Sequence, residues 1–255
     1  MELLILGLVT FIASTIQSAT GFGFALLAVT PFLIVLDSGA AFQLVIVICL
    51  VISLVIWPAL RGRAPRFLLA SLAAGCAAGF PIGIAAHALM ELEALKAVVG
   101  AVVIIVAGQT AWQFRVIRRA LEPGHERAAG RDTAPRGGGA IGVGVVAGAL
   151  TSALAMPGPA VMLYLSRTAL DKDAIRATIL TFFIFAYGGA LALQAAVVGI
   201  ETGTWTTAAA LLPPALAGVA AGHLLARRIT QTVFRWTILV ILLCNGLFIL
   251  ASVVI

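Results

Sequence analysis

Two tracts of small and polar residues interrupt otherwise apolar stretches, and their residue types suit the binding of an anion. The first tract runs over 17–23 and the second over 151–159. Amide and hydroxyl side chains donate hydrogen bonds to oxyanions, and glycine lets the backbone itself approach a ligand closely. The candidate substrate-binding residues are Gln17, Ser18, Thr20, Gly21, Phe22, Gly23, Thr151, Ser152, Pro157 and Gly158.

Both tracts lie where a helix is expected to break. Gly21 and Gly23 weaken the first helix, and a Pro157-Gly158-Pro159 run cannot continue a regular helix because two backbone donors are missing. A helix that begins again after a break points unpaired amides at it, and its end carries about half a positive charge. Two such ends could therefore hold an oxyanion without a buried lysine or arginine. For each hydroxyl taken alone, a bond to a carbonyl of its own helix is an equally good interpretation.

The composition places these tracts inside a membrane. Of the 255 residues, 62% are hydrophobic and 10% are charged, against about 25% charged in a soluble domain. Long uncharged stretches divide the chain, and about 20 apolar residues suffice for a helix to cross the hydrocarbon core. We therefore predict an all-α polytopic membrane protein. The uncharged stretches are 3–36, 38–60, 67–90, 97–114, 137–166, 177–200, 202–226 and 236–255.

Two of these stretches are too long for one crossing. Stretches 3–36 and 137–166 would be about 51 and 45 Å long as straight helices, against a core of about 30 Å. Basic residues concentrate in cytoplasmic loops. If both long stretches are re-entrant hairpins, 15 of the 16 basic residues are cytoplasmic and Lys96 is outside, whereas eight single crossings put only nine inside. The charges thus favour a hairpin over 137–166, but leave open whether 3–36 is re-entrant or a broken single span.

The two halves of the chain share one order of elements. Residues 78–83 match residues 217–222 as Ala-Gly-xxx-Gly at an offset of 139, and the glycines predict close helix packing. A hairpin plus three crossings makes the second half inverted relative to the first, with both termini outside, in the periplasm. Inverted repeats with broken helices recur among transporters. We predict a first repeat over 1–114 (hairpin 3–36, membrane helices 38–60, 67–90 and 97–114), a cytoplasmic linker over 115–136, and a second repeat over 137–255 (hairpin 137–166, membrane helices 177–200, 202–226 and 236–255).

These features resemble the TauE/SafE family, also called the sulfite exporter or toluene-sulfonate uptake permease family. The residues that carry the resemblance are the Gln-Ser-x-x-Gly-Phe-Gly tract over 17–23 ahead of Pro31, and the Pro-Gly-Pro run over 157–159 ahead of Leu163 and Tyr164. The resemblance covers nearly the whole chain, although Ala155-Met156 stand where many members have further glycines. It implies transport of sulfur-containing anions, such as sulfite, sulfonates or sulfoacetate, across the bacterial cell inner membrane.

We predict a transporter of small anions that holds its substrate near the middle of the bilayer, between the two helix ends. No carboxylate lies inside a predicted span, so the buried acid that relays protons in many transporters is missing. An inside-negative potential favours anion exit by about 2.3 kcal/mol per charge per 100 mV, which makes export the easier direction. The alternatives are an anion channel, or a membrane scaffold subunit that transports nothing.

Other classes of protein are not expected. The spans contain no HExxH motif and no pair of carboxylates, so an enzyme is not predicted. Cys49, Cys76 and Cys244 are interpreted as small apolar residues, and no metal or cofactor is predicted. Topology explains the excess of basic residues without nucleic acid, so the predicted partners are a small anion and the lipid bilayer, with a homo-oligomer left open. Tyr187 and Gln194 are interpreted as contacts between helices.

Overall fold

The computed structural model describes residues 1–120, 137–166, 168 and 170–225. Within these ranges the chain is helical and contains no strand, which confirms the all-α prediction. The predicted span 236–255 and residues 121–136 of the predicted linker lie outside the described residues. The helices are α1 (Glu2–Thr20), α2 (Phe24–Leu36), α3 (Ala40–Ile56), the 3-10 helix η1 (Trp57–Leu60), α4 (Arg66–Leu89), α5 (Leu92–Ala120), α6 (Gly137–Leu154), α7 (Gly158–Leu165), α8 (Lys172–Val197) and α9 (Thr202–Leu225).

Five described segments are long and apolar enough to cross a membrane. They are Glu2–Thr20, Ala40–Leu60, Arg66–Leu89, Asp173–Val197 and Thr202–Leu225. Large apolar side chains also cover the outside of the bundle. A surface that faces water rarely exposes so large a continuous apolar area. Examples of such exposed side chains are Leu4, Ile82, Leu89 and Leu224. The chain is a membrane-embedded, multi-pass protein, as its composition predicts.

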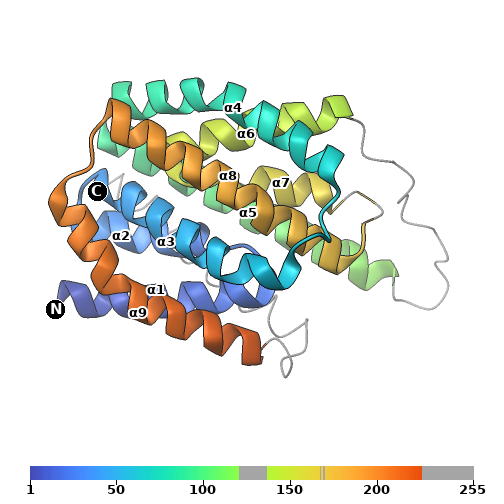
Figure 1. Ribbon diagram of the computed structural model, residues 1–255, viewed down its shortest axis with the longest axis horizontal. Helices are drawn as coiled ribbons and strands as arrows, with labels where there is room; N and C mark the ends of the chain where they lie inside the picture. Colours follow the sequence, from blue (N-terminus) through green and yellow to red (C-terminus); the bar gives the residue numbers. More distant parts are fainter. Residues whose placement is uncertain (121–136, 167, 169, 226–255) are drawn as a thin grey trace.

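The first candidate tract breaks the helix between α1 and α2. Gly21 and Gly23 adopt φ values of 92° and 115°, a left-handed backbone that favours glycine because it has no Cβ. The chain reverses there, and α2 runs back beside α1 (Figure 1). Asp37, directly after α2, pairs with Lys96 at the end of the molecule where α1 begins. Segments α1 and α2 therefore form a hairpin that is open at this end.

The second candidate tract separates α6 from α7. Ala155 has φ 60°, Pro157 is the N-cap of α7, and the helix begins again at Gly158. Near the open end of this hairpin, a Cβ on Gly139 would lie 3.4 Å from the ring of Tyr164. This hairpin is open at the end of the molecule opposite to that of α1 and α2 (Figure 1).

Helix α8 begins earlier than the charge pattern indicates. The predicted span starts at 177, whereas the helix starts at Lys172. The carboxylate of Asp171 accepts a hydrogen bond of 2.7 Å from the Ala174 amide, so this side chain caps the helix. The first turns of α8 therefore carry charged residues that were excluded from the predicted span.

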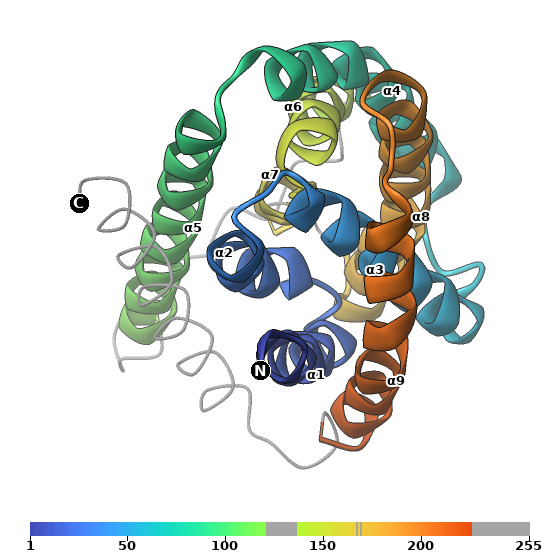
Figure 2. The same ribbon diagram turned by 90° about the vertical axis from the view of Figure 1, so that its left-hand side faces the viewer.

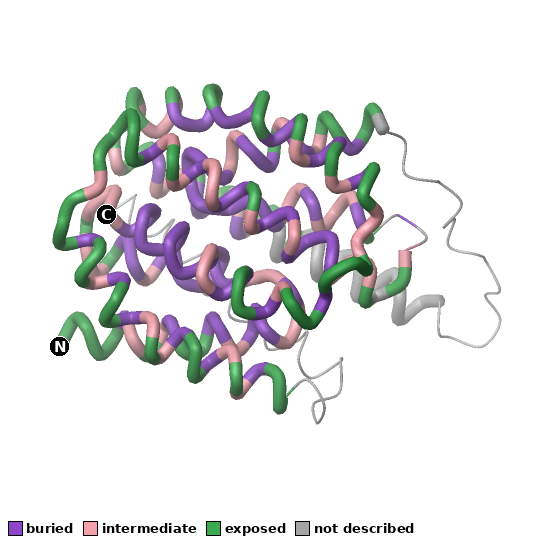
Figure 3. The backbone as a smooth tube through the Cα atoms, in the orientation of Figure 1, coloured by how far each residue is buried: buried purple, intermediate pink, exposed green. Residues whose placement is uncertain are grey.

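Helices α2 and α7, the second helices of the two hairpins, lie inside the bundle. Viewed end-on, α2 and α7 are surrounded by α1, α3, α4, α5, α6, α8 and α9 (Figure 2). Most residues of α2 are buried, and the buried residues of the chain gather around the centre of the bundle (Figure 3). A helix that is apolar on all sides is stable in such a position because it contacts other helices all round.

Glycines bring two pairs of helices into close contact, α4 with α6 and α1 with α9. Each of the four glycines predicted to pack closely lies against a backbone carbonyl oxygen and leaves no room for a Cβ. The pairs are Gly79 with Val145, Gly83 with Ala149, Gly218 with Phe11, and Gly222 with Thr15. The prediction of close packing is confirmed. Both contacts join a helix from the first half of the chain to a helix from the second half.

Candidate anion-binding site

The two helix breaks meet at one small cavity. Its walls come from the break before α2 and the first turn of α2, from the break before α7, and from α8. The lining residues are Phe22, Gly23, Ala25, Leu26, Met156, Gly158, Pro159, Phe183 and Tyr187. Phe183 and Tyr187 lie near the middle of α8, so the cavity lies near the middle of the bundle.

Both α2 and α7 begin at this cavity. The first turn of a helix leaves its amides without partners inside the helix, and its end carries about half a positive charge. Helix α7 has no side chain that caps its first turn, and Gly158 at its start lines the cavity. None of the lining residues is charged, so any positive potential from the lining itself comes from the two helix ends.

Gln17 lies at the first turn of α2. Its side chain is buried, with 1% of its surface exposed, and its Oε1 accepts a hydrogen bond of 3.2 Å from the Phe24 amide. Its Nε2 atom is also buried and has no hydrogen-bond partner among the described residues. Because an unpaired amide donor is costly in an apolar interior, this group is a strong candidate to bind an acceptor at the helix end.

Two further polar groups connect the breaks, and the sequence did not single them out as binding residues. The Cys49 thiol donates to Gln17 Oε1 at 3.9 Å and also lies within hydrogen-bonding reach of the Tyr187 hydroxyl and the Ala25 amide. The Tyr187 hydroxyl donates to the carbonyl of Ala155 at 3.4 Å. A chain of neutral polar groups therefore runs from Gln17 through Cys49 and Tyr187 to the second break.

The predicted hydroxyl ligands are engaged elsewhere. Ser18 donates to the Val219 carbonyl at 2.8 Å, and Ser152 lies 3.0 Å from the Phe80 carbonyl. The hydroxyls of Thr20 and Thr151 bond carbonyls one turn earlier in their own helices. A hydroxyl has a single proton to donate. In this structure the protons of these four side chains are therefore used in bonds to backbone carbonyls, and none of the four lines the cavity. Of the other predicted residues, Phe22, Gly23 and Gly158 line the cavity, and Gln17 lies beside it. Pro157 occupies the N-cap position of α7, and a Cβ at Gly21 would collide with the Arg176 side chain.

Side chains from other helices hold the last carbonyls of α1 and α6. The Arg176 guanidinium donates to the Ser18 carbonyl. In the second hairpin, Gln194 Nε2 donates to the Ser152 carbonyl at 3.1 Å, and the ring of His87 lies 2.9 Å from the Ala153 carbonyl. The interpretation of Gln194 as an interhelical contact is confirmed. These donors suit the partial negative charge at a helix C-terminus and tie each hairpin tip to its surroundings.

The free space in the cavity is small. Its volume of about 10 Å³ is about that needed for one water molecule. An anion with four or more heavy atoms is larger than this space. Binding such an anion therefore requires the surrounding side chains, including the rings of Phe22 and Phe183, to move apart.

The fold and this site define a class of protein. Broken helices that meet at a cavity inside a bundle of membrane helices are the architecture of a secondary transporter. A family model described as sulfite exporter TauE/SafE matches residues 6–249, so the chain belongs to this family of membrane transporters. The resemblance seen in the sequence is thereby confirmed. No curated protein and no solved structure matches the chain.

Proposed function

We propose that this protein carries small sulfur-containing anions, of the sulfite or sulfonate type, across the bacterial inner membrane, mainly outward. The observation that supports this most directly is that α2 and α7 both begin at one cavity. Their two positive ends together supply about one unit of charge. The anion binds between these ends, and Gln17 Nε2 donates to one of its oxygens.

The proposal includes two inverted repeats, over 1–114 and 137–255. Matched contacts support it. Ser18 donates to the Val219 carbonyl. The Ser152 hydroxyl lies 3.0 Å from the Phe80 carbonyl, and 2.9 Å from the Gly148 carbonyl of its own helix. Adding 134 to Ser18 gives Ser152, and adding 139 to Phe80 gives Val219. The same contact thus occurs twice, with the roles of the two halves exchanged.

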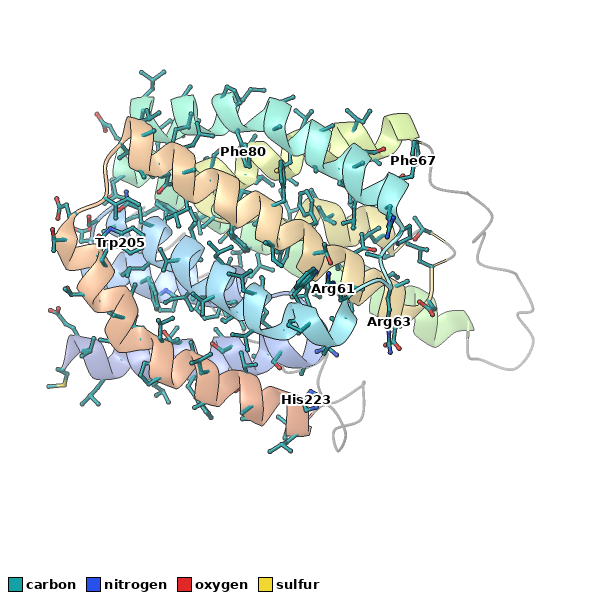
Figure 4. All side chains as sticks on the ribbon, viewed as in Figure 1. Arg61, Arg63, Phe67, Phe80, Trp205 and His223 are labelled. Atoms are coloured by element: carbon teal, nitrogen blue, oxygen red, sulfur yellow. The ribbon has the colours of Figure 1, made fainter. Side chains whose placement is uncertain are left out.

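We also propose an orientation in the membrane. Arg61 and Arg63 lie at the end of the molecule opposite Trp205 (Figure 4). Lys96 lies at the other end, paired with the carboxylates of Asp37 and Glu93. Since basic residues favour the cytoplasmic side, the end with Arg61 and Arg63 is cytoplasmic and the N-terminus, at the other end, is periplasmic. The C-terminus, which the sequence also predicts to be periplasmic, lies outside the described residues.

The small volume of the central cavity favours a carrier over a channel. A carrier occludes its substrate while access changes from one side to the other, whereas a channel needs a continuous path. The inside-negative potential drives anion exit by about 2.3 kcal/mol per charge per 100 mV, so export needs no buried carboxylate. Single-channel currents in a planar bilayer would favour the channel, and saturable exchange favours the carrier.

A flux assay in proteoliposomes tests the proposal. The labelled compounds are the anions sulfite, sulfoacetate and sulfate, together with taurine, a sulfonate whose ammonium group balances its charge; the test variant is Gln17→Ala. The matched control is Gln43→Ala, since Gln43 is also buried but donates to the Gly199 carbonyl at 2.8 Å, away from both breaks. We expect Gln17→Ala to lower flux by about tenfold or more and Gln43→Ala to lower it far less. Equal losses would remove the case for this site, and no flux of any anion would refute the function.

A further inference from the structure

We infer that Arg176 forms a second anion-binding site, on the cytoplasmic side of the central cavity, where a substrate oxyanion binds before it enters the cavity. This inference rests on the proposed function and on the proposed orientation. It adds a charged binding residue to a pathway whose central cavity has an uncharged lining. The ligand is a small oxyanion of the sulfite or sulfonate type.

Arg176 lies on the same face of α8 as two residues that line the cavity. Phe183 and Tyr187 follow it by seven and eleven residues, and at about 100° per residue both project within about 20° of it. Phe183 is about 10 Å further along the helix axis. One turn before Arg176, the exposed Asp173 pairs with Arg63 at 3.0 Å, at the end of the molecule that we assign to the cytoplasm (Figure 4). Arg176 therefore lies between that end and the cavity.

The side chain of Arg176 also contacts the turn between α1 and α2. Its guanidinium donates to the Ser18 carbonyl, and a Cβ at Gly21 would lie 2.9 Å from Arg176 Cγ. Phe22 and Gly23, the next residues along this turn, line the cavity. The same turn thus contacts Arg176 and forms part of the cavity wall, so an anion held at Arg176 is next to the first helix break.

The Arg176 guanidinium has donors left over and no carboxylate partner. Within the described part of the chain, no carboxylate lies within ion-pair distance of it, and the nearby Asp173 already pairs with Arg63. Its Nε atom is buried and has no hydrogen-bond partner among the described residues. An uncompensated charge and an unpaired donor are both costly in this position. An oxyanion offsets both costs, because a guanidinium binds two oxygens of one anion through parallel hydrogen bonds.

Holding the last turn of α1 is the alternative role for Arg176, and a neutral group performs the same task for the second hairpin. Gln194 lies eighteen residues later on the same face of α8, and its Nε2 donates to the Ser152 carbonyl of α6 at 3.1 Å. A carbonyl at a helix end carries only part of a negative charge, so a neutral amide suffices to hold it. The full charge of Arg176 therefore points to an anionic ligand in addition to the carbonyl.

Protection from an arginine-specific reagent tests the inference on the wild-type protein. Phenylglyoxal is added to the protein in detergent, with and without sulfoacetate, and modification of each arginine is measured by mass spectrometry of its peptides. Sulfoacetate at about ten times its dissociation constant should slow modification of Arg176 by about tenfold. Arg63 is the matched control. It is exposed and its partner is a carboxylate of the protein, so its modification should change by less than about twofold.

Two further conditions identify the site that gives the protection. In Gln17→Ala, which weakens the central site, sulfoacetate should still protect Arg176, because the two sites are separate. Potassium chloride at the same ionic strength should protect far less, because a single chloride ion cannot offer two oxygens to the guanidinium. Loss of protection in Gln17→Ala, equal protection by chloride, or an Arg176 that does not react at all would each overturn the inference.

Transport kinetics of Arg176→Gln test the same site during turnover. Glutamine keeps an amide that can donate to the Ser18 carbonyl but removes the charge. We expect the apparent KM for sulfoacetate flux to rise by about tenfold or more, with Vmax changing by less than about twofold. A purely structural role would instead lower the thermal midpoint and Vmax with KM unchanged, and that result would overturn the inference. Arg63→Gln is the control and should change KM by less than about twofold.

The outcomes separate this inference from the proposed function. Flux of sulfoacetate without protection of Arg176 overturns the second site and leaves the central site and the transport function intact. No flux of any anion refutes the function, and the inference with it. If Arg176→Gln does not fold, the labelling of the wild-type protein decides.

Discussion

The hydroxyl of Ser18 donates a hydrogen bond of 2.8 Å to the carbonyl of Val219, and so joins the first helix of the chain to α9. The hydroxyl of Ser152 makes the corresponding contact with Phe80, at 3.0 Å, between α6 and α4. Both contacts occur where glycines let the helix backbones approach. Close approach of this kind is how membrane helices associate without a hydrophobic driving force between them.

The serine pair should act on stability rather than on substrate affinity. Replacing Ser18 with alanine removes an interhelical hydrogen bond. Replacing Ser152 removes a hydroxyl that lies 3.0 Å from the Phe80 carbonyl and 2.9 Å from the Gly148 carbonyl of its own helix. We expect each change to cost about 1 kcal/mol. The two sites lie in separate helix pairs, so the double variant should lose about the sum of the single losses. Unfolding in detergent measures the stability, and flux assays measure the apparent KM for sulfite. A KM that rises tenfold in a stable Ser18→Ala variant would instead identify this hydroxyl as a ligand.

The glycine contacts predict that the effect of a glycine-to-alanine substitution on stability depends strongly on its position. A Cβ at Gly79 would collide with the Val145 carbonyl, whereas Gly142 in α6 is exposed and has nothing within 4 Å of its Cβ position. Gly79→Ala should therefore destabilise the protein by about 1–3 kcal/mol, because backbones must separate.

Gly142→Ala is the matched control and should be neutral or stabilising by up to about 1 kcal/mol, since alanine favours the helix. The thermal midpoint of each variant in the same detergent gives the comparison. Similar midpoints for the two variants would contradict the packing of α4 on α6.

Cys49 should report opening of the cavity. Its side chain is fully buried, so a charged methanethiosulfonate reagent should label it slowly in the closed protein. Turnover opens the cavity, and a gradient of transported anion should raise the labelling rate by about an order of magnitude. The background variant carries Cys76→Ala and Cys244→Ala, so that one thiol remains.

Glu91→Cys in a background that also carries Cys49→Ala serves as the reference for reagent activity, because Glu91 is exposed in the loop between α4 and α5. Its labelling should not depend on the anion gradient. Labelling of Cys49 that is equally fast with and without transported anion would show that the closed cavity does not limit access.

Lys96 should contribute to stability with a defined pH dependence. Hydrogen bonds from its ammonium to Asp37 at 2.7 Å and to Glu93 at 2.9 Å raise the pKa of Lys96 above the ordinary value of 10.5. Because the pKa of Lys96 is higher in the folded protein than in the unfolded chain, its contribution to stability is complete below the pKa of the unfolded chain. This contribution is lost as the pH rises through the pKa of the folded protein. Because both carboxylates are largely exposed, we expect Lys96→Met to cost about 1 kcal/mol or less. The difference in stability between wild type and this variant should vanish only at strongly alkaline pH; loss below about pH 9 would contradict the assignment.

The class of the protein and the places where its helices break follow from local rules. The long uncharged stretches can be recognised from composition alone. Because such stretches cross the membrane as helices, they are predicted without knowing which helices they pack against. Glycine at positive φ and the Pro157-Gly158-Pro159 run limit the backbone within a few residues, so both breaks occur at the predicted tracts. The early start of α8 was missed because a side-chain cap at Asp171 allows charged residues into the first turns.

The sequence by itself determined a helical membrane protein of this family and the positions of its two breaks. Only the tertiary structure decided which polar side chains face the cavity. Gln17 and Ser18 are neighbours on α1, but successive side chains of a helix point about 100° apart, so Gln17 reaches Phe24 while Ser18 reaches Val219. Where every face of a helix is apolar, no periodic pattern marks the inward face. The roles of Cys49 and Tyr187 at the cavity therefore depend on the packing of α3 and α8 against both breaks.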